Sequence, residues 1–580
     1  MYHQFLEQRL QEAIRAVLPE ADVSAVQVRP CADPKFGDYQ ANALMGLAKA
    51  RKMNPRQLAT DVLAKLQVGE WCDKVDIAGA GFLNFWLKSA AIAEAVRSAA
   101  RGEHLFFAKT TAARTVIVDF SSPNVAKPMH VGHIRSTILG DSLARVLRLL
   151  GHRVITDNHI GDWGTQFGKL LVGWKTRLDR AALAAEPIGE MERLYKQVNE
   201  ACEKDPATLE QARQELVKLQ GGDEENLRIW KEMIALSEQQ FDRVYARLGV
   251  KFDHIFGESY YNAKLKSVVE ELTQSGLATE SEGATVVYFE NDPELKEHAA
   301  MIRKSDGGFN YMTTDLATLR FRLEGGVWDG APEEVVYVTD GRQQLHFKQL
   351  FTIFRRWQPR AQVKLAHVWF GSILGEDGKP FKTRSGDTVR LEDLLDEAEE
   401  RALKVVEEKN PELDAAVRRE IARVVGLGSI KYADLSQNRQ SDYVFSWDKM
   451  LSLQGNTAPY LQYAYTRVRG IFRKGDVTEV ASLFAGSDLP ALTKPEEIAL
   501  AKHLLNFGLV LEAVAAEYRP NYLCAWLYDL AALFARFFEN CPVLKSEGLE
   551  RATRLALCDL TARVLKQGLD VLGIETTDRM

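Results

Sequence analysis

Residues 114–155 begin with Arg114-Thr-Val-Ile-Val-Asp-Phe120, continue through Ser121-Ser-Pro-Asn-Val-Ala-Lys-Pro-Met-His-Val-Gly-His133, and end with Arg153-Val-Ile155. The run up to Phe120 is short, apolar and rich in β-branched residues, which is typical of a buried parallel strand. Two prolines interrupt the loop that follows. A helix comes next, with an apolar stripe at Leu139, Leu143, Val146 and Leu150. Strand, loop, helix and strand form a βαβ unit, so this stretch predicts a Rossmann-type, doubly wound parallel sheet.

The chain before this unit, residues 1–112, has the pattern of a small α+β domain. The predicted elements are a helix over Gln4–Val17, a strand near Ala25–Arg29, a second helix opened by Phe36–Gln40, and paired short strands within Val75–Leu87. Small residues near Lys109–Ala113 predict a hinge to the next domain.

Residues 113–395 are predicted to form the Rossmann-type domain. Its charged, helical residues at about 175–245 are predicted to be an insertion. Strands resume at Ala284–Phe289, Glu334–Val338 and Ala366–Phe370. Beyond residue 395 the chain is almost wholly helical, and we expect a connecting region at 396–450 and an all-α bundle at 451–580. Long amphipathic segments occur at Ala402–Glu408, Ala499–Tyr518, Leu523–Asn540 and Ala552–Leu572.

The composition, with 580 residues, 46% hydrophobic and 27% charged, indicates a soluble globular protein of several domains. The six cysteines are scattered without a Cys-x-x-Cys pair, which favours neither zinc nor disulfides and indicates a reducing, intracellular compartment. We expect neither a signal peptide nor an apolar run of membrane-spanning length. The net charge of −6 disfavours a nucleic-acid partner, but only weakly, because a basic groove can coexist with an acidic remainder.

His130 and His133 are three residues apart, so they share one face of a helix's first turn. Gly132 between them lets a bulky ligand approach the backbone. The free N–H groups and positive potential of a helix start favour phosphate, and two imidazole donors there would stabilise developing charge on an α-phosphate and a leaving pyrophosphate. Taken alone, the pattern equally fits two histidines that cap a helix. Its place on the first crossover of a doubly wound sheet favours nucleotide binding.

Ser121-Ser-Pro-Asn-Val-Ala-Lys-Pro-Met-His-Val-Gly-His-Ile-Arg-Ser-Thr137 resembles the HIGH region of the bacterial-type, class I arginyl-tRNA synthetases. Asn158-His-Ile-Gly-Asp-Trp-Gly-Thr-Gln-Phe-Gly168 resembles the segment that follows it in that family. The N-terminal domain and the helical C-terminus are also similar, so the resemblance covers nearly the whole chain.

The resemblance implies an enzyme that uses ATP with Mg²⁺ to convert L-arginine to arginyl-adenylate and pyrophosphate. Arginine would then pass to the 3′-terminal ribose of tRNA(Arg). It also implies a cytoplasmic monomer that needs bound tRNA even in the first step. No zinc, organic cofactor, membrane partner or separate editing domain is expected.

The guanidinium of arginine is best matched by carboxylates, which accept its paired N–H bonds. The resemblance implies contacts to arginine from Asp119, Ser122, Asn124, His130, Tyr311, Asp315 and Gln343, with Tyr311 and Asp315 at the guanidinium. These two lie one helical turn apart, so both can face one cavity. On residue pattern alone Asp315 is more often a solvated helix acid, whereas Asp119, at the end of a buried strand, needs a partner. Many family members carry Glu at the position of Asp119, which leaves its contact distance open.

Class I synthetases carry a KMSK loop whose second lysine neutralises ATP phosphates. Here Gly378-Lys-Pro-Phe-Lys-Thr-Arg-Ser-Gly386 departs from that motif, and neither Lys379, Lys382 nor Arg384 aligns cleanly. The resemblance implies that Lys127, three residues before His130, replaces the missing lysine; the alternative is a solvated loop lysine. The predicted catalytic groups are His130, His133 and Lys127. The predicted ATP site adds Gly132, Lys382 and Arg384.

Two segments are candidates for tRNA contact. Gly79–Phe85 resembles the family segment that meets the tRNA elbow, where Phe82 would stack on a base and Asn84 would bond its edge. Strand alternation places both on one face, opposite Leu83, but a core phenylalanine and an edge-strand asparagine fit equally well. In the bundle, which resembles the anticodon-binding domain, Tyr460, Tyr463 and Arg467 recur at helical spacing. Such a stripe suits stacking and phosphate contact, although tyrosines in this pattern are more often packing residues.

Three alternatives remain open. A class I synthetase for cysteine or glutamine is disfavoured because the chain lacks the zinc ligands of a cysteine pocket and carries the acids Asp119 and Asp315. A smaller nucleotidyltransferase would need neither the N-terminal domain nor the helical C-terminus. A non-catalytic RNA-binding relative is hard to reconcile with an intact set of candidate catalytic side chains.

Overall fold

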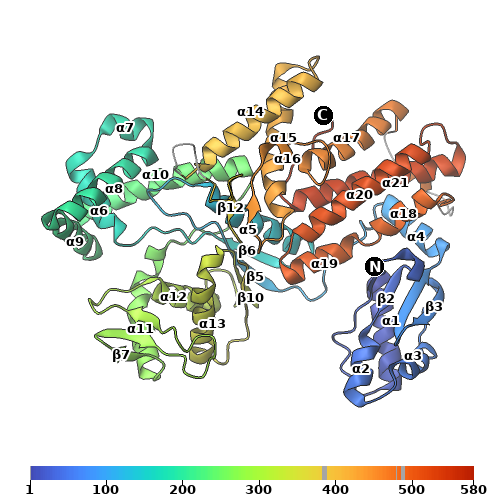
Figure 1. Cartoon of the computed structure of the whole chain (residues 1–580), viewed down its shortest axis with the longest axis horizontal. Helices are drawn as coiled ribbons and strands as arrows, with labels where there is room; N and C mark the ends of the chain where they lie inside the picture. The colour runs from blue at the N-terminus through green and yellow to red at the C-terminus, as the bar shows by residue number, and fades with distance from the viewer. Residues whose placement is uncertain (1, 382–387, 478–479, 485–489) are drawn as a thin grey trace. The chain divides into compact units, whose positions relative to one another are not determined.

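The computed structural model describes residues 2–381, 388–477, 480–484 and 490–580 (Figure 1). The chain forms two compact units. One contains Met1–Lys109, Ser452–Asp570 and Glu575–Met580, and the other contains Thr110–Leu451 and Val571–Ile574. The first division falls inside the small-residue stretch Lys109–Ala113. The predicted fold class, a parallel-sheet domain with an α+β N-terminal domain and a helical C-terminus, is confirmed.

A four-stranded parallel sheet forms the centre of the second unit, in the order β11-β10-β5-β6. Its strands are β5 (Thr115–Asp119), β6 (Arg153–Asp157), β10 (Glu334–Tyr337) and β11 (Lys364–His367). Helix α5 (Val131–Leu149) connects β5 to β6, as the βαβ pattern predicted. It packs so closely that a Cβ on Gly140 would lie 2.2 Å from Cγ of Phe120. Because the strands are parallel, the loops after β5, β6 and β10 meet at one edge of the sheet.

A smaller antiparallel sheet, in the order β7-β8-β9, lies in the same unit. It contains β7 (Thr279–Ser281), β8 (Ala284–Val287) and β9 (Ala300–Arg303), and α11 (Asn262–Gln274), α12 (Tyr311–Glu324) and α13 (Gln344–Trp357) share its hydrophobic core. The predicted strand at Ala284–Phe289 therefore exists but ends earlier. It belongs to this sheet rather than to the parallel one, because an apolar run does not encode its pairing partner.

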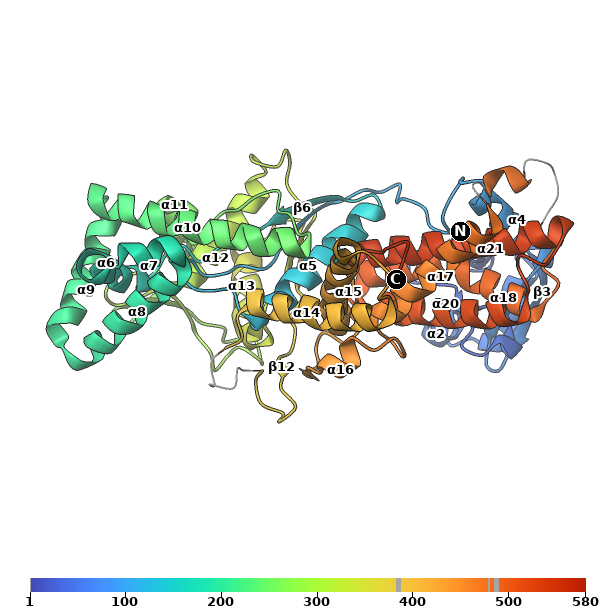
Figure 2. The same cartoon turned by 90° about the horizontal axis from the view of Figure 1, so that it is seen from above.

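The expected insertion is helical, although its helices begin at Gln166 rather than near residue 175. They are α6 (Gln166–Arg177), α7 (Arg180–Ala185), α8 (Pro187–Lys204), α9 (Pro206–Gln220) and α10 (Glu224–Leu248). The first four lie together in both views, and α10 leads back from them toward the parallel sheet (Figures 1 and 2). Aspartates at residues 179, 205 and 223 cap three of these helices, as expected for short acceptor side chains.

Residues 2–100 form the α+β domain, whose antiparallel sheet has the order β1-β2-β4-β3. Its helices are α1 (Tyr2–Val17), η1 (Pro34–Phe36), α2 (Ala43–Arg51), α3 (Pro55–Leu63) and α4 (Ser89–Ala100). Its strands are β1 (Arg29–Pro30), β2 (Tyr39–Ala41), β3 (Cys72–Ala78) and β4 (Phe82–Leu87). The first helix and the paired strands are confirmed.

Two predictions for this domain are wrong. Of the segment Ala25–Arg29 only Arg29 is in a strand, and Phe36–Gln40 does not open a helix. Its last residues enter β2, where Tyr39 pairs with Phe85, and the helix begins only at Ala43. Pairing with a strand more than forty residues away overrides the local pattern.

The helical part of the second unit contains α14 (Leu391–Lys409), α15 (Ala415–Leu435) and α16 (Trp447–Met450), with two short paired strands, β12 (Ile373–Leu374) and β13 (Tyr443–Val444). The first unit contains α17 (Ala458–Gly475), η4 (Ala481–Phe484), α18 (Pro495–Leu504), α19 (Phe507–Glu517), α20 (Asn521–Asn540) and α21 (Gly548–Val571). The last residue of α21, Val571, is assigned to the second unit. The predicted single helix Ala499–Tyr518 is thus two helices.

The stretch Pro495–Glu517 has the length and composition to cross a membrane, contrary to the expectation that no apolar run reaches that length. Half of its most apolar window, 50%, is buried inside the fold, and the break between α18 and α19 interrupts it. It packs as part of the core of the helical domain.

Candidate active site

The loop from β5 to α5 is held in an unusual backbone conformation. Ser121, Ser122 and Ala126 have positive φ angles of 75°, 48° and 62°, which cost non-glycine residues energy and persist only where surrounding contacts enforce them. Those contacts are present: the Ser122 N–H donates to Oδ1 of Asn158 at 3.0 Å, and the Ala126 N–H donates to Oγ of Ser237 at 2.9 Å. Residues of the segment after β6 and of α10 therefore shape the loop that carries the HIGH-like motif.

His130 and His133 stand at the start of α5 with their ring centroids 4.0 Å apart. Nδ1 of His130 accepts from the N–H of Gly132, and Nδ1 of His133 accepts from the N–H of His130, both at 3.0 Å. A neutral imidazole that accepts at Nδ1 carries its proton on Nε2. The capping interpretation is thus correct, and it leaves each Nε2–H as a donor for a ligand.

The surroundings favour the neutral form of both imidazoles. Burial is the main cause that lowers the pKa of His130, and the nearby Arg342 and Lys127 lower it further. Burial lowers the pKa of His133 to about 3, and His130 contributes. Between them, a Cβ on Gly132 would lie 2.9 Å from Cε1 of His130. The helix start therefore offers neutral N–H donors beside an open backbone, a combination suited to phosphate.

Lys127 is exposed on the loop before His130, and its Nζ lies 5.5 Å from the centroid of the Tyr195 ring. The competing candidates Lys382 and Arg384 fall outside the described residues. The chain resumes against the same loop: the Val131 N–H donates to O of Val389 at 3.0 Å, and the Leu391 N–H donates to O of Met129 at 2.9 Å. The segment that follows the degenerate lysine motif therefore lies against the loop that carries the paired histidines.

Asp119 has the partner that a buried acid requires. Nη2 of Arg322 donates to Oδ2 of Asp119 at 2.6 Å and to Oδ2 of Asp157 at 2.7 Å, and all three side chains are buried. Oγ of Ser122 donates to Oδ1 of Asp119 at 3.3 Å. Arg322, on α12, was not anticipated, because nothing in its local sequence separates it from a surface arginine.

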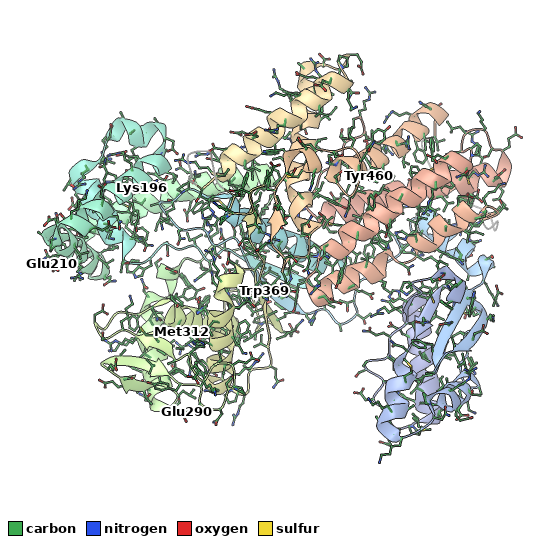
Figure 3. The ribbon with its side chains drawn as sticks, in the orientation of Figure 1. Lys196, Glu210, Glu290, Met312, Trp369 and Tyr460 are labelled. Atoms are coloured by element: carbon green, nitrogen blue, oxygen red, sulfur yellow. The ribbon has the colours of Figure 1, made fainter. Side chains whose placement is uncertain are left out.

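Tyr311 and Asp315 share one side of α12, the helix on which Figure 3 labels Met312. Both contact His346 of α13: Nε2 of His346 lies 2.6 Å from Oδ2 of Asp315, and the ring centroids of Tyr311 and His346 are 4.9 Å apart. Asp315 is therefore not a solvated helix acid. Gln343 is exposed at the end of η3 (Gly341–Gln343), one turn before His346.

Asn124 lies against the segment after β6. It pairs with Gly161 in an isolated bridge, and a Cβ on Gly161 would lie 2.3 Å from Oδ1 of Asn124. Gly161 of the Asn158–Gly168 motif thus makes room for the predicted arginine contact.

Glu258, in η2 (Glu258–Tyr261), is an acidic side chain that sequence reasoning missed. The pKa of Glu258 is raised to about 7, mainly by burial; His159 opposes the rise, and the negative charges of Asp315 and Asp162 add to it. A half-buried acid in the electrostatic field of a second acid suits a cationic ligand. No spacing in the sequence marks it.

The candidate tRNA contacts differ in exposure. Phe82 is partly buried, and Asn84 is buried with its Oδ1 accepting from Nε2 of Gln40 at 2.8 Å. Tyr460 is partly buried, with its ring 5.5 Å from that of Tyr528.

The packing interpretation is wrong for Tyr463, which is 42% exposed. The guanidinium of Arg467 lies 5.5 Å from the Tyr463 ring and 5.3 Å from the Phe538 ring. Together they form an exposed cationic and aromatic stripe on α17 and α20.

All six cysteines are free. Across the described part of the chain, no three His, Cys, Asp or Glu side chains gather in a way that would hold a metal ion. The cationic groups Lys127 and Arg342 beside the histidines instead suit an anionic ligand.

Three family models match the chain: "tRNA synthetases class I (R), catalytic domain" over residues 96–447, "DALR anticodon binding domain" over 461–580, and "Arginyl tRNA synthetase N terminal domain" over 4–87. The chain is 47% identical to the arginine–tRNA ligase of Chromobacterium violaceum over 100% of both chains, and 47% identical to that of Proteus mirabilis over 99% of both.

Its fold is similar to the solved arginyl-tRNA synthetase of Thermus thermophilus, with a TM-score of 0.83 at 26% identity over 100% of both chains. The solved arginyl-tRNA synthetase of Plasmodium falciparum gives a TM-score of 0.82 at 29% identity, over 100% of this chain and 99% of that one.

Proposed function

The chain belongs to the class I arginyl-tRNA synthetases, and we propose that its β5–α5 junction is where ATP and L-arginine react. ATP enters with Mg²⁺ as part of the substrate complex. The arginine carboxylate attacks the α-phosphate, pyrophosphate leaves, and arginyl-adenylate forms. The 3′-terminal ribose hydroxyl of tRNA(Arg) then attacks the activated carbonyl, and AMP leaves.

The observation that carries the proposed ATP site is the pair of neutral imidazoles at the start of α5, whose Nδ1 atoms are both occupied by capping bonds. The two remaining Nε2–H groups, with Gly132 between them, are the proposed donors to the α-phosphate and the leaving pyrophosphate. Donors fixed in place before the reaction stabilise charge without reorganisation. No side chain needs to form a covalent bond.

Lys127 is the proposed replacement for the KMSK lysine, and its ammonium would neutralise the triphosphate from the side of the loop. Lys382 and Arg384 are the alternatives. The return of residues 388–391 to the histidine loop supports a shared phosphate site, since both segments reach the same helix start.

The proposed arginine pocket has a guanidinium end and an α-amino end. Tyr311, Asp315 and Glu258 form the guanidinium end. The other end consists of Asp119, Ser122, Asn124, His130 and Gln343. An analogue without the guanidinium would leave the partly buried acids Asp315 and Glu258 without a cationic ligand, which is the physical basis of rejection.

The proposed tRNA contacts are Phe82 and Asn84 at the elbow and Tyr460 and Arg467 on the helical domain. Asn84 would have to share its amide between Gln40 and a base, so it is the weaker of the elbow candidates. We further propose a cytoplasmic monomer that uses neither zinc nor an organic cofactor and has no membrane partner.

Charging of bulk tRNA with each radiolabelled amino acid in turn tests the function. We expect arginine alone to be incorporated, and only with ATP. Incorporation of another amino acid, or of none, would contradict the proposal. Gel filtration with light scattering at two protein concentrations tests the monomer.

A further inference from the structure

One face of α8 holds cations from three separate segments. Glu192, Tyr195 and Asn199 lie three and four residues apart, so they project from the same side of the helix. Lys196, labelled in Figure 3, also projects from α8 and pairs with Glu192 at 2.8 Å. One side of α8 is thus polar.

The three cations differ in origin. Lys127 comes from the histidine loop, and its Nζ lies 5.5 Å from the centroid of the Tyr195 ring. Lys169 comes from α6; its Nζ lies 5.9 Å from the same ring and donates to Oδ1 of Asn199 at 2.6 Å. Arg390 comes from the segment after the degenerate lysine loop, and its Nη2 donates to Oε2 of Glu192 at 3.3 Å.

The chemistry of the partner matters for each cation. Arg390 meets a carboxylate, and Lys169 meets an amide oxygen as well as the Tyr195 ring, whereas Lys127 meets the ring. An acid beside Lys127 would neutralise its charge and compete with a phosphate. A neutral ring attracts the ammonium of an exposed lysine only weakly, so it limits where the flexible side chain goes and still releases the charge to an incoming triphosphate.

We propose that Tyr195 is a positioning residue of the ATP site: its ring holds the Lys127 ammonium beside the paired histidines, and through it the helical insertion contributes to adenylate formation. This inference rests on the proposed role of Lys127. The proposal gives a functional role to α8, which carries none of the predicted site residues.

The test is arginine-dependent ATP–pyrophosphate exchange with tRNA present. Tyr195→Leu should raise KM for ATP about fivefold, the size expected when an exposed lysine loses its cation–π contact, with KM for arginine unchanged. Tyr195→Phe keeps the ring and should behave like the parent enzyme. Lys196→Met, on the same helix, is the matched control and should change neither constant.

A double-mutant cycle separates positioning from a structural role. If Tyr195 acts through Lys127, adding Tyr195→Leu to the Lys127→Met enzyme should not raise KM for ATP any further. Any of three results would overturn the inference alone. They are an equal rise in KM for ATP in Tyr195→Leu and Tyr195→Phe, a further rise in the double variant, and no effect of Tyr195→Leu. An unimpaired Lys127→Met enzyme would overturn the proposed role of Lys127 as well.

Discussion

Single residues in this protein combine structural and chemical tasks. The histidines at positions 130 and 133 satisfy free N–H groups of α5 through Nδ1, which a helix start requires. The same bonds set the tautomer, because an accepting Nδ1 leaves the proton on Nε2. Helix capping therefore orients the proposed catalytic donors.

Substitution of His133 can separate these two tasks. His133→Asn places an amide oxygen where Nδ1 accepts, but it has no donor at the position of Nε2. We expect ATP–pyrophosphate exchange to fall by about 10²-fold or more with little change in melting temperature.

His133→Ala loses the cap as well and should cost a further ~1 kcal/mol of unfolding free energy. An Asn variant that is as active as the parent would contradict the donor role.

Glu258 predicts a pH dependence. Because burial raises the pKa of Glu258 to about 7, the side chain is protonated below that pH and anionic above it. KM for arginine should therefore fall as pH rises through about 7, since the anion attracts the guanidinium. In Glu258→Gln this step should disappear from a plot of KM against pH.

The raised pKa of Glu258 also affects stability, and there a rise in pH is unfavourable. The ordinary pKa of a glutamate is 4.5, so between pH 4.5 and about 7 the folded state binds the Glu258 proton more tightly than the unfolded state does. The free energy of unfolding should then decrease as pH rises across that window. A parent and a Gln variant with identical stability profiles would contradict the assignment.

At the scale of elements, the close packing of α5 on β5 positions the histidine loop. Gly140→Val would place its Cβ only 2.2 Å from Cγ of Phe120, so the substitution should destabilise the protein by about 3 kcal/mol. Thermal unfolding measures this. Gly46→Ala in α2, where an added Cβ meets nothing within 4 Å, is the control and should stabilise slightly.

At the scale of the whole molecule, the candidate arginine and ATP site lies in one unit, and the candidate tRNA contacts lie in the other. Arg467 is exposed among aromatic rings on the helical domain, far along the chain from the histidine loop. Arg467→Gln should weaken tRNA binding several-fold and reduce the slope of log affinity against log salt by about one, with KM for arginine unchanged. Filter binding at several salt concentrations checks this, and an unaltered slope would exclude a phosphate contact.

The sequence by itself determined the β5–α5–β6 unit, the helical insertion and the helical C-terminus, because hydrophobic periodicity acts over one turn or one strand. It also identified the paired histidines and the shared side of Tyr311 and Asp315, since helical spacing alone sets those relations.

Only the tertiary structure decided which distant residues meet. It placed Arg322 between Asp119 and Asp157. It also placed Glu258 where the charge of Asp315 raises its pKa, and the Lys127 ammonium over the Tyr195 ring. It also turned the segment after Phe36 into a strand paired with β4. In each case the partners are separated by tens to hundreds of residues, and their contact depends on how whole elements pack, a property that no local pattern of side chains carries.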